Sequence, residues 1–287
     1  MNITATMVKE LRDKTGAGMM DAKKALVEVD GDMDKAMEVL RQKGIASAEK
    51  KMGRIAAEGR VGSYVDSTVG AMIEVNCETD FVAKNAEFIE LTDGLAELVA
   101  KTNPADVAAL EATTCPKCGK VIADVLKEKI ASIGEKMTIR RFVRYEGNIA
   151  TYIHNGKIGV LLETSAADAE LAKDICLHIA SSAPEFVSRN EIPASVIEEE
   201  RRIEMGKEDL QKKPEQIREK IVEGRVNKLM AERCLLEQPF VKNPDLTIEQ
   251  LISGKLDIKR FTRFVLGEGL EKRSENFAEE VMGQIQG

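Results

Sequence analysis

The sequence of 287 residues contains no tryptophan, two histidines, three tyrosines and eight phenylalanines. Two histidines cannot supply a histidine-rich metal centre. No apolar run reaches the ~18 residues that a membrane-spanning helix needs. The first residues also lack the charged and then apolar layout of a signal peptide. We therefore expect a cytoplasmic protein that has no membrane segment and does not bind a membrane.

Basic residues are also in deficit, with 42 lysines and arginines against 49 aspartates and glutamates and a net charge of −7. Binding to nucleic acid regardless of its sequence needs a basic surface that releases counterions. We therefore expect a protein partner and no direct contact with nucleic acid. A hydrophobic content of 43% with 32% charged residues is typical of a globular protein with a buried core. The length suits about two domains.

The five cysteines are scattered, and without an export signal we expect them to be reduced. Cys115 and Cys118, in the segment Cys-Pro-Lys-Cys-Gly-Lys, have the spacing of half a zinc site. A structural zinc ion needs four ligands, and no second pair of this kind follows. The sequence therefore favours an irregular loop here over a zinc site within one chain, and it indicates no cofactor.

Motifs for catalysis are missing as well, because the chain has no phosphate-binding loop, no HExxH and no GxSxG. His178 lies in an apolar helical run, which predicts a packed and hydrogen-bonded side chain. His154 precedes Asn155-Gly156, a strong turn signal, so we expect it to be exposed. A contact role and an ordinary surface position both remain open for it. We expect that the protein is not an enzyme.

Apolar residues recur at helical spacing in three segments of residues 1–45, which predicts three short helices. The breaks between them fall at Thr15–Gly18 and Asp30–Asp32. Gly44 is the predicted end of the third helix. We expect residues 46–57 to form a linker.

From residue 58 onward the chain repeats itself. Residues 58–65 (EGRVGSYV) resemble 146–153 (EGNIATYI), 88 positions later, and residues 139–145 (IRRFVRY) resemble 258–264 (IKRFTRF), 119 positions later. This predicts a duplicated core, in which each copy runs strand, strand, helices, strand. The expected class is therefore α+β with two small antiparallel sheets, the copies covering residues 58–145 and 146–265.

The unequal offsets mean that the second copy carries about 30 additional residues before its last strand. We assign them to the charged helical segment 192–237, which Pro214 divides into a hairpin of two helices. Residues 266–287 are predicted to form a further helix.

The most unusual local sequence is Glu74–Lys84, which ends a predicted strand and begins a helix. Thr79 or Asp80 can cap that helix, and Phe81 falls in its first turn. One interpretation packs Phe81 against its own helix with Phe88. The other makes Phe81 an anchor for a pocket on a partner, oriented by the Asp80 carboxylate. The residues alone leave both open.

Two segments make the chain recognisable: residues 11–26 (LRDKTGAGMMDAKKAL) and 74–84 (EVNCETDFVAK) resemble the two signatures of the bacterial elongation factor Ts family. The likeness continues through the core, the hairpin and the C-terminal segment, although Cys115–Lys120 lies outside the family pattern. It implies a guanine-nucleotide exchange factor for elongation factor Tu, the GTPase that brings aminoacyl-tRNA to the ribosome. It also implies a ubiquitin-associated-like fold for residues 1–45 and a coiled coil for the hairpin.

The resemblance assigns roles to individual positions. It implies that the segment around Phe81 inserts beside the magnesium site of the GTPase and displaces Mg²⁺, through Thr79, Asp80, Phe81 and Val82. It implies further contacts with the GTPase through Arg12, Met19, Met20, Lys23 and His154, and docking of the C-terminal helix on the same domain. The alternative is an adapter protein that binds a partner without nucleotide exchange. A homodimer and a 2:2 complex with the GTPase are left open.

Overall fold

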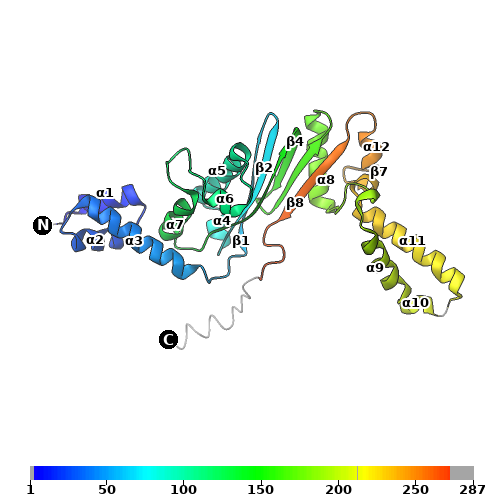
Figure 1. The fold of residues 1–287 in the computed structure, drawn as a ribbon, viewed down its shortest axis with the longest axis horizontal. Coiled ribbons are helices and arrows are strands. Elements are labelled where there is room, and N and C mark those ends of the chain that lie inside the picture. Colours follow the sequence, from blue (N-terminus) through cyan, green and yellow to red (C-terminus); the bar gives the residue numbers. More distant parts are fainter. Residues whose placement is uncertain (1–2, 212, 272–287) are drawn as a thin grey trace. The chain divides into compact units, whose positions relative to one another are not determined.

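The computed structural model describes residues 3–211 and 213–271 (Figure 1). Helices and short strands alternate along the chain, so the predicted α+β class is confirmed. No helix in this described part is both long enough and apolar enough to cross a membrane. The described residues fall into two compact units, the first with residues 3–62, 73–142 and 265–271 and the second with residues 63–72 and 143–264 without 212.

Three helices open the chain, as predicted: α1 (Ala5–Thr15), α2 (Met19–Glu28) and α3 (Met33–Lys51). The Thr4 hydroxyl caps α1 by accepting a hydrogen bond from the Met7 amide, and Gly16 ends the helix with a φ of 68°. The helices bury a small cluster of aliphatic side chains between them, namely Val8, Leu11, Ala22, Ala25, Leu26 and Ala36. Helical spacing of apolar residues therefore predicted this part of the fold correctly.

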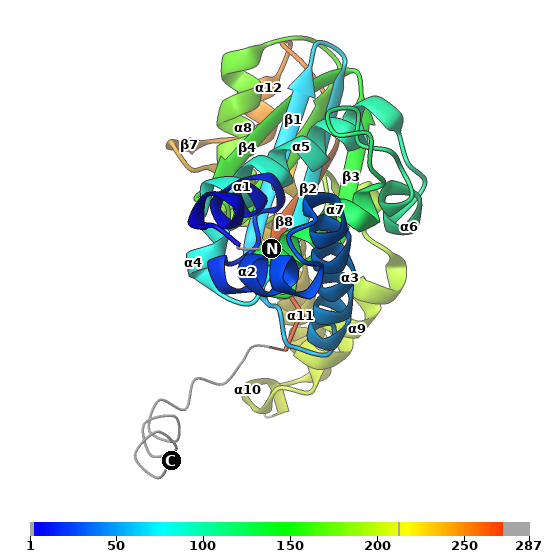
Figure 2. The same cartoon turned by 90° about the vertical axis from the view of Figure 1, so that its left-hand side faces the viewer.

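The predicted helix end at Gly44 is wrong, because α3 continues to Lys51. In its second half α3 packs against α7 (Ile122–Ile133), and Figure 2 shows the two helices side by side. A Cβ atom at Gly44 would lie 3.0 Å from the Ala131 Cβ. The glycine therefore allows two helices to approach each other closely. It has this role only in the folded chain, so the local sequence resembled a helix end.

The first sheet has the order β1–β2–β3, with β1 at Glu58–Asp66, β2 at Val69–Cys77 and β3 at Thr138–Glu146. Between β2 and β3 the chain forms four helices, α4 (Asp80–Ala83), α5 (Ala86–Thr102), α6 (Val107–Glu111) and α7. The central strand β2 is buried along almost its whole length. Helix α5 buries one apolar face, which includes Phe88, Leu95 and Val99.

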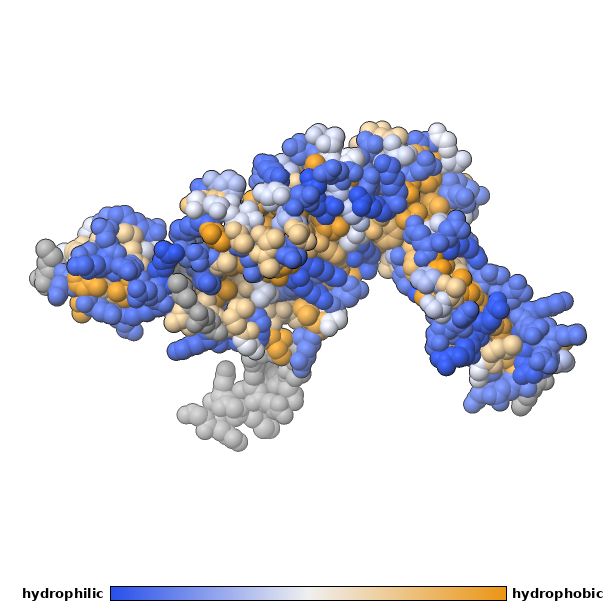
Figure 3. All heavy atoms as spheres, in the orientation of Figure 1, coloured by the Kyte–Doolittle hydropathy of each residue, from blue (hydrophilic) through white to orange (hydrophobic). Residues whose placement is uncertain are grey.

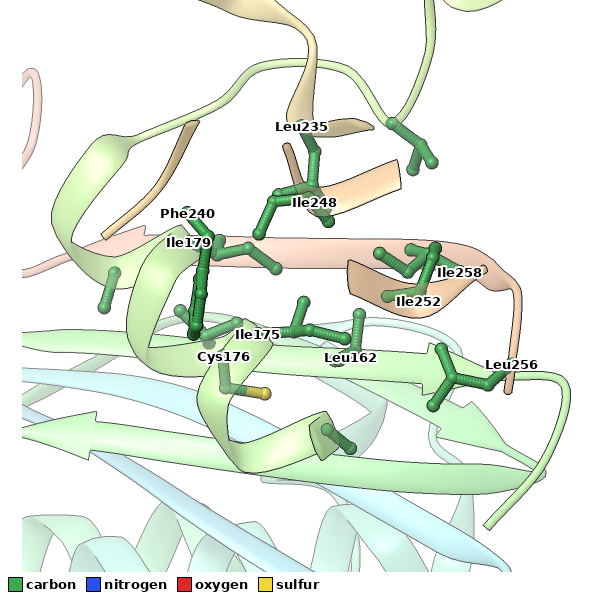
Figure 4. Close-up of a cluster of buried hydrophobic side chains, with 14 residues drawn as sticks. Leu162, Ile175, Cys176, Ile179, Leu235, Phe240, Ile248, Ile252, Leu256 and Ile258 are labelled. Atoms are coloured by element: carbon green, nitrogen blue, oxygen red, sulfur yellow. The ribbon is translucent and has the colours of Figure 1, made fainter. Parts of the chain in front are cut away.

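The second sheet repeats this plan with the order β4–β5–β8, as the internal repeat predicted. Its strands are β4 (Asn148–His154), β5 (Ile158–Thr164) and β8 (Ile258–Val265), and β4 pairs antiparallel with β5. Helix α8 (Ala169–Ser182) follows β5, while β6 (Pro239–Phe240), β7 (Asn243–Thr247) and α12 (Ile248–Ile252) precede β8. Figure 4 shows the core that these elements share, which includes Leu162, Ile175, Ile179, Phe240, Ile248 and Ile258.

His178 on α8 is buried and hydrogen-bonded, as predicted. Its Nε2 lies 2.9 Å from Gln238 Oε1, and its Nδ1 accepts a hydrogen bond from the Val241 amide at 3.2 Å. Burial lowers the pKa of His178, against an opposing effect of the Gln238 hydrogen bond. The side chain therefore serves the core of the second unit as a neutral imidazole.

The additional residues of the second copy form the predicted helical hairpin, with α9 (Ala194–Met205), α10 (Glu208–Gln211) and α11 (Glu215–Arg233). Helices α9 and α11 pack together over a narrow apolar seam that includes Val222, Val226 and Met230. The outer surface of this hairpin is largely hydrophilic in Figure 3. Of the predicted C-terminal helix, residues 272–287 lie outside the described residues, and residues 266–270 form turns.

A buried carboxylate recurs at the same position in both sheets. In the first sheet Glu74 on β2 is fully buried and accepts hydrogen bonds from Arg140 at 2.9 Å and Arg141 at 2.7 Å, both on β3. In the second sheet Glu163 on β5 accepts one from Arg260 at 2.6 Å. Burial raises the pKa of Glu74, but the Gly267 amide and the two guanidinium groups outweigh it, so that the net shift is downward.

We expect Glu74→Ala to lower the free energy of unfolding by about 2–4 kcal/mol at pH 7. Breaking a buried ion pair typically costs ~3–5 kcal/mol. We expect a smaller loss of stability here because both arginines remain partly in contact with water. Since the folded pKa is depressed, the contribution of Glu74 is present above the unfolded pKa and is lost as pH falls through the folded value. Urea titrations from pH 7 to pH 3 should therefore show the difference from wild type shrinking at acid pH. Glu10→Ala, at an exposed pair, is the control and should change little; a gap that persists at pH 3 would contradict the assignment.

Candidate functional site

The corner between β2 and α5 carries the segment Thr79–Val82. Thr79 has an extended backbone (φ −128°, ψ 154°) and caps the one-turn helix α4, where its Oγ1 accepts a hydrogen bond from the Val82 amide at 3.3 Å. Of the two candidates for the cap, Thr79 is therefore the one that the structure uses. The cap starts α4 at Asp80 and so places Phe81 in its first turn.

Glu135, which lies between α7 and β3, holds this corner by hydrogen bonds. Its Oε2 accepts hydrogen bonds from the Glu78 and Thr79 amides, both at 3.0 Å, and its Oε1 accepts one from Thr79 Oγ1 at 2.6 Å. In return Glu78 Oε1 accepts a hydrogen bond from the Lys136 amide at 2.6 Å. These reciprocal contacts fix the backbone immediately before Phe81. Sequence reasoning missed Glu135, because it lies 56 residues from Thr79 and belongs to no recognisable motif.

Phe81 points into solvent, and 82% of its surface is exposed. Phe88, by contrast, is completely buried, so the interpretation that pairs these two rings within the protein is wrong. Phe81 is a large apolar side chain that lies in water, so it contributes nothing to the hydrophobic core. An exposed aromatic side chain of this kind is available as an anchor for another molecule.

The neighbours of Phe81 differ from it in burial. Asp80 is partly exposed, and one of its carboxylate oxygens lies 2.6 Å from the Lys84 ammonium group, one helical turn further on. Val82 is half-buried. The corner therefore presents one aromatic ring with a carboxylate beside it, while Thr79 and Val82 connect it to the fold.

His154 ends β4 in the second unit, and the turn that follows has Asn155 and Gly156 at φ values of 51° and 69°. The Lys157 amide donates to the His154 carbonyl at 2.9 Å and closes the turn. His154 is exposed, as expected. Its ring is oriented by the Tyr152 hydroxyl, 3.0 Å from Nδ1. At the other edge Asn155 Nδ2 lies 3.3 Å from Nε2, so neighbours on the same hairpin hold the ring in a defined direction.

The N-terminal candidates lie on α1 and α2. Arg12 on α1 and Met19, Met20 and Lys23 on α2 are all exposed. Met20 is 63% exposed, and Val27, two helical turns further along the same face of α2, is 57% exposed. The sequence did not single out Val27. Val27 could have been found from the sequence as an apolar residue outside the buried stripe of Ala22, Ala25 and Leu26.

The described residues thus bring Thr79–Val82 together at one corner and Met19, Met20 and Lys23 on one helix. His154 belongs to the other compact unit. Within residues 3–211 and 213–271 no group of three or more histidine, cysteine, aspartate or glutamate side chains could hold a metal ion. The arrangement at Phe81 is suited to recognition by insertion, because it offers an exposed aromatic ring with a carboxylate beside it.

Comparison with known proteins identifies a family that this chain resembles. The model of the family described as "Elongation factor TS" matches residues 78–268. Curated relatives extend the match over the N-terminal helices: a protein named elongation factor Ts from Alkalilimnicola ehrlichii is 48% identical over 293 residues, with 100% of both chains covered. Proteins of the same name from Chromobacterium violaceum and Syntrophotalea carbinolica are 50% and 48% identical, covering 97% and 98% of both chains.

Proposed function

The chain belongs to the elongation factor Ts family, and from that premise we propose that it binds elongation factor Tu in its GDP form and promotes the release of GDP. The protein is accordingly a translation elongation factor. In this proposal it works in the cytoplasm as an exchange factor, and it catalyses no change of covalent bonds.

The observation that carries the proposal is the exposed Phe81 on a corner held by Glu135. A nucleotide-exchange factor needs a rigid projection that enters its partner, since a mobile one loses conformational entropy on binding. Phe81 supplies the apolar ring and Asp80 the charge. The backbone that carries them is fixed by three hydrogen bonds to one carboxylate.

Insertion of this corner beside the nucleotide site of the GTPase would act through magnesium. Mg²⁺ requires near-ideal octahedral geometry, and it bridges protein groups and phosphate oxygens. A ring and a carboxylate that shift its ligands therefore weaken the binding of GDP. The coupling is reciprocal, so the GTPase without nucleotide binds the exchange factor more tightly by the same factor.

The remaining candidates form the wider contact in the same proposal. Met19, Met20 and Lys23 on α2, with Arg12 on α1, provide an exposed apolar and basic surface. His154 provides an oriented imidazole at a turn. These positions would contribute affinity, whereas the corner at Phe81 would produce exchange.

The direct test is the rate at which labelled GDP leaves elongation factor Tu when unlabelled nucleotide is in excess. We expect the full-length protein to accelerate the release at catalytic concentrations. We also expect excess Mg²⁺ to reduce the acceleration. Binding to the GTPase with an unchanged release rate would overturn the proposal and favour the adapter. Sedimentation shows whether the two proteins bind and measures the stoichiometry of their complex.

A further inference from the structure

The loop between α6 and α7 contains a pair of cysteines in a closed hairpin. Thr114 and Val121 form a β-bridge across its base, and the Cys115 amide donates to the Lys120 carbonyl at 2.7 Å. At the tip the Gly119 amide donates to the Cys115 carbonyl at 2.8 Å, with Gly119 at a φ of 69°. Residues 115–120 are thus held as a tight turn, and the expectation of an irregular loop is wrong.

This turn presents both thiols to the surface. Cys115 is partly exposed and Cys118 is exposed, whereas Cys77, Cys176 and Cys234 are buried. Burial raises the pKa of the Cys176 thiol to about 12, so that it stays protonated at neutral pH. Cys115 and Cys118 are therefore the two thiols of the chain that are placed to react or to bind a metal.

We propose that Cys115 and Cys118 form half of a zinc site, which is completed by the same two residues of a second copy of this chain. Zinc in structural sites takes four ligands in a tetrahedron, and Cys₄ is one of its common ligand sets. Among the described residues no third histidine, cysteine, aspartate or glutamate joins the pair. Residues 212 and 272–287 contain no cysteine or histidine. We therefore assign the two further ligands to thiolates of another molecule.

A second copy fits this requirement because each chain offers the same two sulfur atoms on an exposed turn. A two-fold axis through the metal would place the turns in equivalent positions, which is the commonest symmetry of protein dimers. Zinc with four thiolates carries a net charge of −2. Lys117 lies beside the thiol pair and acts on Cys115 electrostatically, so its positive charge would offset part of this negative charge. Without the metal, the two Lys117 side chains would repel each other.

The surface next to the turn also suits a second copy. Cys115 and Pro116 border a groove of about 380 Å³, whose floor is formed by apolar side chains of α5 and α7, among them Leu91, Leu95, Leu98, Ile122 and Val125. A copy held at the turn by zinc would cover this apolar surface. The same two cysteines thus predict both a metal site and a metal-dependent dimer.

The test uses the full-length protein, reduced with a phosphine and freed of metal by a chelator. Zn²⁺ alone is titrated while bound metal and molecular mass are measured, and Co²⁺ serves as the spectroscopic probe. We expect about one zinc per two chains, a doubling of mass that the chelator reverses, and the charge-transfer and d–d bands of tetrahedral cobalt thiolate.

Cys118→Ser should abolish zinc uptake and dimerisation and leave circular dichroism unchanged, because the side chain is exposed. The matched control Cys176→Ala removes a buried thiol and should bind zinc as the wild type does. Zinc bound by a single chain, no zinc bound, or a dimer that forms without metal would each overturn the proposal. A disulfide formed with glutathione disulfide, in a protein that takes up no zinc when reduced, would assign the pair to redox chemistry.

Discussion

Replacing Phe81 with alanine is expected to reduce the acceleration of GDP release by roughly 100-fold. An aromatic anchor at the centre of an interface typically contributes about 2–4 kcal/mol, and each ~1.4 kcal/mol changes an equilibrium or a rate tenfold. The fold should be unaffected, since Phe81 is 82% exposed. The release of labelled GDP measures the effect of the substitution on exchange, and a urea titration of the variant measures its effect on the stability of the fold.

Two further variants serve as controls for this experiment. Met52→Ala removes another large apolar side chain, 51% exposed and not among the proposed contacts, and it should leave exchange unchanged. Phe88→Ala removes the nearby buried ring and should lower the free energy of unfolding by about 3–5 kcal/mol. If Phe81→Ala retained full exchange activity, the corner would not be the element that acts on the nucleotide site.

The second large effect is expected at Glu135, a residue that would act through Phe81 without touching the partner. Glu135→Ala removes three hydrogen bonds from the Glu78–Thr79 backbone and the Thr79 hydroxyl. We expect exchange to fall about tenfold, equivalent to ~1.4 kcal/mol, because the corner must then be ordered when it binds. The free energy of unfolding should fall by about 1–3 kcal/mol, as for other lost hydrogen bonds to a charged group.

A purely structural role for Glu135 would give a different pattern. Glu135→Gln keeps one acceptor oxygen and should recover part of the exchange activity. Hydrogen exchange should become faster at the Glu78 and Thr79 amides in Glu135→Ala and stay slow in the core of α5. Glu87→Ala, which breaks an exposed pair with Lys129, is the control with normal exchange. Equal loss of activity in the Ala and Gln variants, with protection lost throughout the first unit, would contradict a positioning role.

The sequence predicted features that are decided within a few residues of one another. The three N-terminal helices follow from apolar spacing, a helix cap at Thr79 or Asp80 from polar side chains next to a helix start, and the exposed His154 from Asn155-Gly156. The duplicated core was visible because both copies retain similar strands. In each case the physical cause is a local hydrogen bond, a turn conformation or a periodic apolar face.

Gly44 shows where local reasoning failed. A glycine after a helical stretch is typical of a helix end, but here it lies inside α3 and admits the Ala131 methyl group of α7. Helix α7 begins 78 positions after Gly44 in the sequence. The local pattern therefore contained no sign of the contact that decides the role of the glycine.

The candidate site also combines features that the sequence determines with features that only the tertiary structure decides. Its residue types and the presence of a helix cap at Thr79 or Asp80 were determined by the sequence itself, whereas the choice of Thr79, the exposure of Phe81 and the contacts of Glu135 were decided by the tertiary structure. The same holds for Glu74 with Arg140 and Arg141, and for Glu163 with Arg260. Hydrogen bonds of this kind join residues more than 50 positions apart, and only the packing of helices and strands brings such residues within about 3 Å of one another.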